Sequence, residues 1–496
     1  MSAASSALFS ETRRGAAISL ARAHLLILAI LFIVTLPLVN PLVHGDGVGY
    51  YAYLRAPFIQ HNLQFEEDWR HANLVFVESR LGPNHQFRPD QYTSTGRLGN
   101  VFTVGPAILW TPFFLLAHSA VLITNWLGGR IPADGFSLPY RLLVALGTAF
   151  YGFCGLALSY LLARKYLTPW SALLATLGIW AGSSLPVYLY FNPFWSHAHS
   201  AFIVALFLWY WDHTGPSRSW KQWILMGLIS GLLVDVYFIN GVFLLIPLVE
   251  SIAVYAKHWR SRDGAAIAHQ FGANVTYLAV FVIVILPTLI TRKIVFGGWF
   301  RFGSYSDAPW NWHAPFWRSV LFSSDHGMLR WTPLLGLALV GLFVSLPGVR
   351  RIQAYLGLAA IAFFYVISCY PSWDGLASYG NRFFISLTPV FVVGLAILIE
   401  RVTLFFRSAR AALAAQAFVL ALFALWNLGF IFQWGTHLVP ARGGISWSAM
   451  VHNQFSEVPQ RLTHSLEAYF MHRGEMMQHI EQEDIEQQKL EEQRGE

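Results

Sequence analysis

Charged residues are scarce in this chain of 496 residues, where Asp, Glu, Lys and Arg together make up 12%. Soluble domains carry about 25%. Hydrophobic residues reach 55%, and apolar runs recur along almost the whole length. Many of these runs have the roughly 20 residues needed to span a bilayer. The composition excludes a soluble enzyme with a single anchor and predicts an all-α polytopic membrane protein.

Cysteine is nearly absent, and this limits what can be said about redox compartment. Cys154 and Cys369 both lie in apolar runs, where we expect them to be core residues. The net charge of +7 comes from scattered Lys and Arg, without a dense basic stretch, so no nucleic-acid partner is expected. The first apolar run is long and lacks an Ala-x-Ala exit, so no cleavable signal peptide is predicted.

The positions of the basic residues predict a topology, because short cytoplasmic loops collect Lys and Arg. Six basic clusters follow or precede apolar runs. Placing all six inside predicts a multi-pass plasma (inner) membrane protein with about eleven spans, a cytoplasmic N-terminus and an outer C-terminus. The expected spans are 24–43, 139–163, 168–190, 195–212, 222–237, 239–256, 272–295, 331–347, 353–370, 383–399 and 413–434.

This solution leaves a large first outer (periplasmic) loop, residues 44–138, inside a membrane domain that covers 1–434. Val101–Leu127 is apolar enough for a twelfth span. We interpret it as an interfacial helix, because a further crossing would place Arg164, Lys165 and most later clusters outside. Residues 435–496 form an outer tail, whose Glu- and Gln-rich end from 474 is expected to be a solvated helix or partly disordered.

Asp46 is the most informative residue of the outer loops. It follows the first apolar run directly, in HGDGVGYYAYLR. A carboxylate at the mouth of a span costs free energy unless it has a partner or a function. Gly45 and Gly47 allow a tight turn and a close approach to a substrate. We expect Asp46 to be catalytic; the alternative is that it caps the helix that follows.

The other outer loops combine carboxylates, imidazoles, guanidiniums and aromatic rings, an inventory that suits a phosphate-linked sugar. Arginine forks bind phosphate oxygens, aromatic faces pack on sugar rings, and a carboxylate can deprotonate a hydroxyl. The candidates for the donor phosphate are Arg382, Arg330 and Arg301. The candidates for the sugar and acceptor pocket are Tyr50, Glu66, Glu67, Asp68, Asn192, His197, His199, Tyr305 and Tyr379.

Each group also has a plainer interpretation. Glu66, Glu67 and Asp68 have the pattern of a solvated acidic run, and the arginines could anchor at lipid headgroups. His197 and His199 could provide two metal ligands from an extended segment, but a third and a fourth ligand are not identifiable. No cofactor is therefore assigned, and a divalent metal stays an alternative that we do not favour.

Several segments up to about residue 434 resemble the GT-C class of membrane glycosyltransferases, which includes protein O-mannosyltransferases and the lipid A aminoarabinose transferase. The acidic motif at the start of the first outer loop is here Gly45–Tyr51. Thr103–Pro112 resembles the proline-containing interfacial helix of the class, and Tyr140–Tyr166 resembles its second span. SSDHGMLRWTPLL and SWDGLASYGNRFF resemble segments of its bacterial members.

The resemblance implies a polyprenyl-phosphate-linked sugar as donor, Asp46 as the catalytic carboxylate and inversion at the anomeric carbon. The acceptor would be a lipid, glycan or protein hydroxyl, and membrane lipids would surround the chain. Two departures matter. The mannosyltransferases carry an Asp-Glu pair where this chain has Asp46-Gly47, and the second outer loop has histidines where oligosaccharyltransferases have acidic residues. The alternatives are a lipid-linked sugar flippase or transporter, a glycan polymerase or ligase, and a non-catalytic scaffold.

Overall fold

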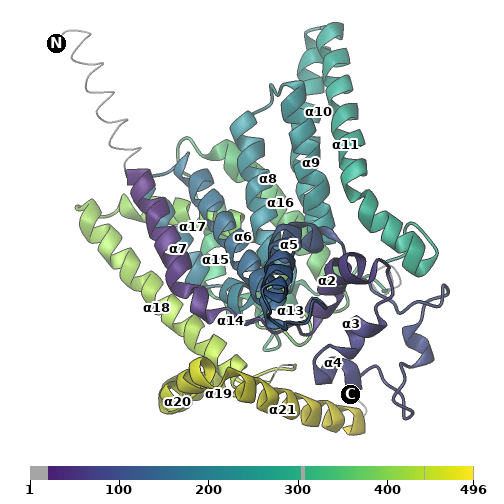
Figure 1. Ribbon diagram of the computed structural model, residues 1–496. Coiled ribbons are helices and arrows are strands. Elements are labelled where there is room, and N and C mark those ends of the chain that lie inside the picture. Colours follow the sequence, from purple (N-terminus) through teal and green to yellow (C-terminus); the bar gives the residue numbers. More distant parts are fainter. Residues whose placement is uncertain (1–19, 303–307, 441, 495–496) are drawn as a thin grey trace.

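The chain is all-helical in the residues that the computed structural model describes, 20–302, 308–440 and 442–494 (Figure 1). Within these ranges, extended pairing is limited to two isolated β-bridges, Leu81 with Phe87 and Tyr92 with Leu98. Both lie in the first outer loop. The predicted all-α class is therefore confirmed.

Eight helices of the described chain are long and apolar enough to cross a membrane. Seven coincide with expected spans, and the eighth is α5. They are Leu20–Leu38, α5 (Gly105–Trp126), α6 (Leu138–Arg164), η5 with α10 (Phe238–Arg260), α11 (Gly264–Phe296), α16 (Arg350–Cys369), η6 with α17 (Arg382–Thr403) and α18 (Ala409–Gly435).

The other four expected spans also coincide with helices: α7 (Pro169–Ala181), α8 (His197–Thr214), α9 (Trp220–Val236) and α15 (Leu334–Phe343). With 13 and 10 residues, α7 and α15 reach only about 20 and 15 Å, less than the roughly 30 Å of a hydrocarbon core. The 168–190 run is divided, because α7 ends at Ala181 and a separate π-helical turn, η4, covers Val187–Phe191. The total of eleven spans thus stays a prediction.

The centre of the molecule is α17, which packs against α6, α7 and α15. Its sequence, TPVFVVGLAILI, is apolar on every side, and residues Thr388–Ile397 are all buried. Around it, α6 packs on α8, and α9 packs on α11. In contrast, α11 exposes Phe271, Leu278 and Ile283, as expected of a helix at the periphery that faces lipid.

A buried ionic network joins the helices at the end of the molecule where α6 and α8 terminate. Asp212 accepts from Lys165 Nζ at 2.7 Å and from Arg351 Nη1 at 3.3 Å. Glu250 pairs with Arg218 and accepts from Arg351 Nη2 at 3.1 Å. Because both carboxylates are almost fully buried, these cations are needed to offset their desolvation.

The direction of α5 bears on whether it crosses the membrane. In Figure 1, α5 is seen almost along its axis, whereas α9, α10 and α11 are seen from the side. Its start is fixed by the Val104 amide, which donates to Thr288 Oγ1 at 3.0 Å. Trp110 Nε1 donates to Thr148 Oγ1 of α6 at 2.8 Å. This crosswise direction favours an interfacial helix, although length and composition also suit a span.

The C-terminal tail is helical in its described part. For the segment from 474, a solvated helix was one expectation and partial disorder the other. The tail contains α19 (Trp447–His452), the π-helical turn η7 (Asn453–Glu457), α20 (Val458–Met471) and α21 (Arg473–Arg494). Tyr469 Oη donates to the Leu38 carbonyl at 2.7 Å, and Arg473 Nη1 donates to the Val39 carbonyl at 2.7 Å. These contacts tie the tail to the end of the first helix, below α18 in Figure 1.

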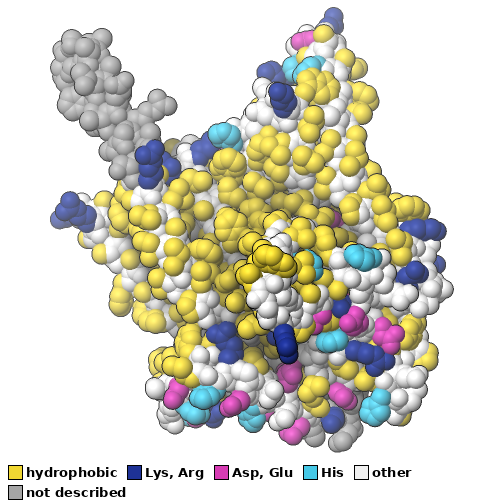
Figure 2. Space-filling model, in the orientation of Figure 1, with side chains coloured by type: hydrophobic (Ala, Val, Ile, Leu, Met, Phe, Trp, Pro, Cys, Tyr) yellow, Lys and Arg dark blue, Asp and Glu magenta, His cyan; other side chains and the backbone are white. Residues whose placement is uncertain are grey.

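The surface shows a division by chemistry. Figure 2 shows hydrophobic side chains over the middle of the visible face, with most acidic and histidine side chains at its lower end. In Figure 1 this lower end holds α3 (Glu66–Arg70), α4 (Leu74–Glu78) and the tail helices. The polar loops and the tail therefore share one end of the apolar body.

Candidate functional site

Two residues that are far apart in the sequence meet at this polar end. Arg382 Nη1 donates to Asp46 Oδ2 at 2.7 Å. The Asp46 side chain keeps 30% of its surface exposed, whereas the Arg382 side chain is 8% exposed. The carboxylate is thus reachable from solvent, while the guanidinium is held by the protein around it.

Two glycines allow Asp46 to occupy this position. Asp46 is the first residue of α2 (Asp46–Arg55), and Gly45 before it has a φ of +56°, in the region that favours glycine. A Cβ on Gly47 would lie 2.6 Å from Phe194 Cβ, so only glycine allows α2 to approach the 192–196 segment this closely. The prediction that these glycines permit a turn and a close approach agrees with this geometry.

The 192–196 segment provides aromatic and hydroxyl groups beside the ion pair. The guanidinium carbon of Arg382 lies 4.4 Å from the ring centre of Trp195, and Trp195 Nε1 donates to the His44 carbonyl at 3.0 Å. Ser196 Oγ donates to Tyr50 Oη at 2.9 Å. Burial raises the pKa of Tyr50, so this phenol stays neutral and can act only as a hydrogen-bonding group.

A second guanidinium acts on Asp46 from the first outer loop. Burial lowers the pKa of Arg80 to about 10, and the Asp46 carboxylate opposes this shift. Arg80 Nη1 donates to the Phe76 carbonyl and to Ser79 Oγ, both at 3.0 Å. Arg80 stays charged at neutral pH and adds positive potential near Asp46. The sequence offered no signal for it, because nothing distinguishes it from other loop arginines.

The acidic run lies at the other end of α2. Glu67 and Asp68 pair with Arg55, at 2.8 and 3.3 Å, and Glu66 pairs with Arg70 at 2.9 Å. Arg55 is the last of the 10 residues of α2, roughly 14 Å along the helix from Asp46. Burial raises the pKa of Asp68 to about 7, with Arg55 opposing. These carboxylates therefore hold the loop together, away from Asp46.

His197 and His199 do not form a common site. The metal alternative requires an extended segment, but α8 begins at His197, so the two side chains point about 200° apart around the helix. His197 packs against Tyr188, with ring centres 4.8 Å apart, whereas His199 packs against Trp110 at 5.1 Å. In this geometry the two imidazoles do not face a common ligand, and His197 lies beside Trp195.

The remaining candidates lie in several places. Arg330 Nη2 donates to the Ile445 carbonyl at 2.7 Å and lines a surface depression with Phe322, Leu329 and Trp447. Tyr379 is buried and bonds Asn427 Oδ1 at 2.8 Å. Asn192 is buried next to His44, Arg301 is exposed, and Tyr305 lies outside the described residues. Of the three phosphate candidates, only Arg382 contacts Asp46 in the described structure.

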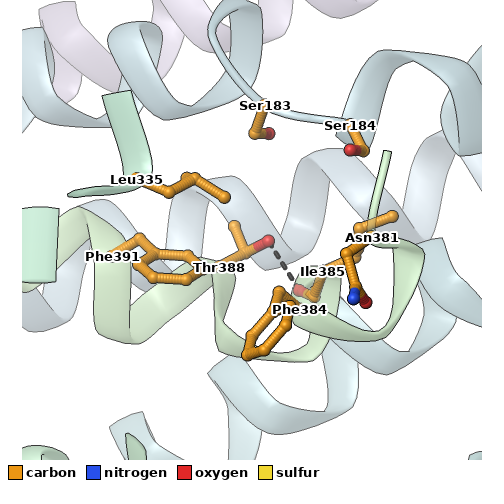
Figure 3. Close-up of a pocket in the computed structure, with 8 residues that line it drawn as sticks. All are labelled: Ser183, Ser184, Leu335, Asn381, Phe384, Ile385, Thr388 and Phe391. Atoms are coloured by element: carbon orange, nitrogen blue, oxygen red, sulfur yellow. Dashed lines mark hydrogen bonds between the residues drawn. The ribbon is translucent and has the colours of Figure 1, made fainter. Parts of the chain in front are cut away.

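A small cavity lies between α15 and the segment around Asn381 (Figure 3). Ser183, Ser184 and Asn381 line it together with side chains from α15, η6 and α17. It holds about one water molecule. A sugar does not fit here, so this cavity is a packing gap.

Asp325, His326 and Asp374 form a cluster that the sequence analysis did not single out. One ligand atom from each lies within 4.8 Å of the other two. Burial lowers the pKa of His326 to about 4, and the backbone of Asp374 opposes this shift. The available signal was the pair of segments SSDHG and SWDG, which contain all three residues.

The site can therefore bind an anion and accept a proton. Arg382 and Arg80 provide positive charge around Asp46, and Trp195 provides a flat apolar face at the same place. Charge-assisted bonds from a guanidinium are strong and directional. A partly exposed carboxylate within this positive field suits transfer chemistry on a substrate that carries phosphate.

Comparisons with known proteins find distant similarity in structure and no similarity in sequence. No family model matches the chain, and no curated protein matches its sequence. Two crystal structures of ArnT from Cupriavidus metallidurans are similar in structure. The apo form has 14% identity, covers 84% of this chain and 72% of its own, and gives a TM-score of 0.44. The form bound to undecaprenyl phosphate has 13% identity, coverage of 83% and 71%, and a TM-score of 0.45.

Proposed function

We propose that this chain is an inverting glycosyltransferase that moves a sugar from a polyprenyl-phosphate donor to an acceptor hydroxyl on the outer face of the plasma (inner) membrane. The observation that carries the proposal is the contact between Asp46 and Arg382, at 2.7 Å. It joins the motif of the first outer loop to the arginine that follows the SWDG segment. A base and a phosphate-binding group are thereby placed side by side.

In this proposal Asp46 accepts the proton of the acceptor hydroxyl as the hydroxyl attacks the anomeric carbon. The bond from that carbon to the phosphate oxygen breaks, and the polyprenyl phosphate leaves with the electron pair. Arg382 and Arg80 stabilise the negative charge that develops on the phosphate. A single displacement needs only one positioned carboxylate. Because the hydroxyl attacks opposite the leaving group, the product has the inverted anomeric configuration.

Arg382 has a second role before the donor binds. Its contact with Asp46 offsets the negative charge of a carboxylate that is partly withdrawn from water. The planar guanidinium has five N–H donors. It can therefore contact a phosphate while it keeps one hydrogen bond to Asp46. Binding of the donor then orients the base and the leaving group together.

The proposed orientation follows from the basic residues. Arg164, Arg260 and Arg350 lie at ends of helices α6, α10 and α16, and Arg407 lies in the connection between α17 and α18. Positive residues favour the cytoplasmic side. With these ends inside, the N-terminus is cytoplasmic and Asp46 faces the periplasm. A lipid-linked donor and a lipid, glycan or protein acceptor would meet there.

Transfer by the purified protein tests the proposal directly. A panel of radiolabelled undecaprenyl-phosphate sugars is incubated with the protein and membrane extract, and new glycosidic products are separated and quantified. We expect Asp46→Asn to lower transfer on the order of 10²–10⁴-fold, the usual effect of losing a positioned proton acceptor. Asp90→Asn, which removes an exposed carboxylate of the same loop, should leave transfer unchanged.

The outcomes separate the alternatives. Transfer near the wild-type level in Asp46→Asn would refute the role of Asp46. Movement of the lipid-linked sugar across vesicles without a new glycosidic bond would indicate a flippase. Products that contain preassembled glycans would indicate a polymerase or ligase. An anomeric configuration retained in the product would exclude the single displacement.

A further inference from the structure

Two outer loops bring three metal-type ligands together next to the proposed site. Asp325 and His326 come from the loop before α14 (Met328–Trp331), and Asp374 comes from the loop between α16 and η6. One ligand atom from each lies within 4.8 Å of the others. Because the ligands come from loops almost 50 positions apart, the fold itself creates the cluster.

His326 gives a second and independent indication of a ligand. Its side chain is fully buried. The backbone of Asp374 is close enough to raise the pKa of the ring, yet neither ring nitrogen has a hydrogen bond of good geometry to a described residue. Nδ1 lies 3.4 Å from Asp325 Oδ1, which also has no such bond. A buried polar group without a partner loses the hydrogen bonds that it makes to water, and this destabilises the fold. A ligand between these atoms would offset that cost.

The rest of the His326 environment fixes the ring in place. The indole of Trp331 packs edge-on against it, with ring centres 4.7 Å apart. Trp331 Nε1 donates to the Ser324 carbonyl at 3.1 Å, which ties the indole back to the same loop. The imidazole is therefore held in place by packing against Trp331.

The donor set indicates which ligand fits. Carboxylate oxygens with one imidazole nitrogen suit divalent cations such as Mn²⁺ and Zn²⁺. An anion is excluded, because two carboxylates would repel it. A monovalent cation would not match the negative charge of both carboxylates, whereas a divalent cation does.

The cluster adjoins Arg382 through the backbone. Gly375, which follows Asp374, lies so close that a Cβ there would be 3.3 Å from Arg382 Cγ. We propose that Asp325, His326 and Asp374 bind one divalent cation of the Mn²⁺ or Zn²⁺ type beside Arg382. The role of this cation rests on the proposed function: it would add positive charge on the side of the donor phosphate. The proton would still be transferred to a residue of the chain.

Manganese binding tests the site without any need for transfer activity. The full-length protein in detergent is titrated with MnCl₂, and the free ion is measured by electron paramagnetic resonance. We expect one saturable Mn²⁺ per chain. His326→Gln and Asp374→Asn should each weaken binding at least tenfold, the scale of losing support for a metal site. Asp90→Asn, an exposed carboxylate of the first outer loop, is the matched control.

Spin-echo spectroscopy of the wild-type protein covers the case in which the variants fail to fold. Mn²⁺ bound here should show coupling to one imidazole ¹⁴N, from His326. The site is overturned if wild-type protein binds no Mn²⁺ saturably, if bound Mn²⁺ shows no ¹⁴N coupling, or if folded His326→Gln binds as tightly as wild type. Transfer that is unaffected by chelation would refute only the role beside the phosphate, and absent transfer would not affect the binding result.

Discussion

Replacing Arg382 by Gln should weaken donor binding by an amount that the structure allows one to work out. A hydrogen bond to a charged partner contributes about 1.5–3 kcal/mol. In the free protein Arg382 already bonds Asp46, and an ion pair with a partly exposed partner contributes up to about 1 kcal/mol. The net loss is thus about 0.5–2 kcal/mol, which raises the donor KM roughly 2- to 30-fold.

The assay is a donor titration at saturating acceptor, with kcat and KM determined separately. Arg382→Lys should fall between wild type and Arg382→Gln, because lysine keeps the charge but loses the planar fork and the packing on Trp195. Arg70→Gln is the control, since Arg70 is exposed and pairs with Glu66 in the first outer loop. Its donor KM should equal that of wild type.

The reasoning would be refuted by a donor KM for Arg382→Gln within twofold of wild type. A loss confined to kcat would also contradict it, because a group that binds the donor phosphate in the ground state must change KM. Near-equal values for Arg382→Lys and wild type would show that charge alone matters and that the fork geometry does not.

Three further predictions concern other parts of the chain. Gly47→Ala should lower transfer at least tenfold, because the added Cβ meets Phe194 at 2.6 Å and must displace α2; unchanged activity would contradict this. Tags at positions 97 and 134 should report the same membrane side if α5 is interfacial, and opposite sides would make it a span. Hydrogen bonding to Asp484 raises the pKa of His437, so docking of α21 is strongest below about pH 6.5 and is lost as pH rises through the raised value. Limited proteolysis of the tail across this pH range measures the docking of α21, with His437→Gln as the pH-insensitive variant. A wild-type cleavage profile that matches that of His437→Gln would refute the predicted pH dependence.

Much of the helical architecture could be predicted from the sequence, because hydrophobic length is a local property. Every expected span coincides with a helix of the described chain. The run 168–190 shows the limit of such reasoning. Its apolar content is continuous, but Gly182 to Ser184 interrupt the helix, and this change of the backbone depends on packing that hydropathy does not report.

The site could be predicted only in part. Asp46 was identified from its neighbours in the sequence, and Arg382 from its place at the start of a span. Their contact spans 336 positions and depends on how α2 packs on the 192–196 segment. Arg80 and the pairing of Glu67 with Arg55 could not be foreseen, because loop residues find their partners through tertiary structure. Likewise, a shared metal for His197 and His199 requires an extended segment, whereas both residues lie in the first turn of α8.

The buried ions around Asp212 and Glu250 have a consequence for how the molecule can move. Arg351 joins both carboxylates, so α8, α10 and α16 are clamped at the end opposite Asp46. Separating them there would leave buried charges without partners, at a cost of about 3–5 kcal/mol. Any opening that admits a long lipid is therefore a splaying at the polar end, with the clamped end as its pivot.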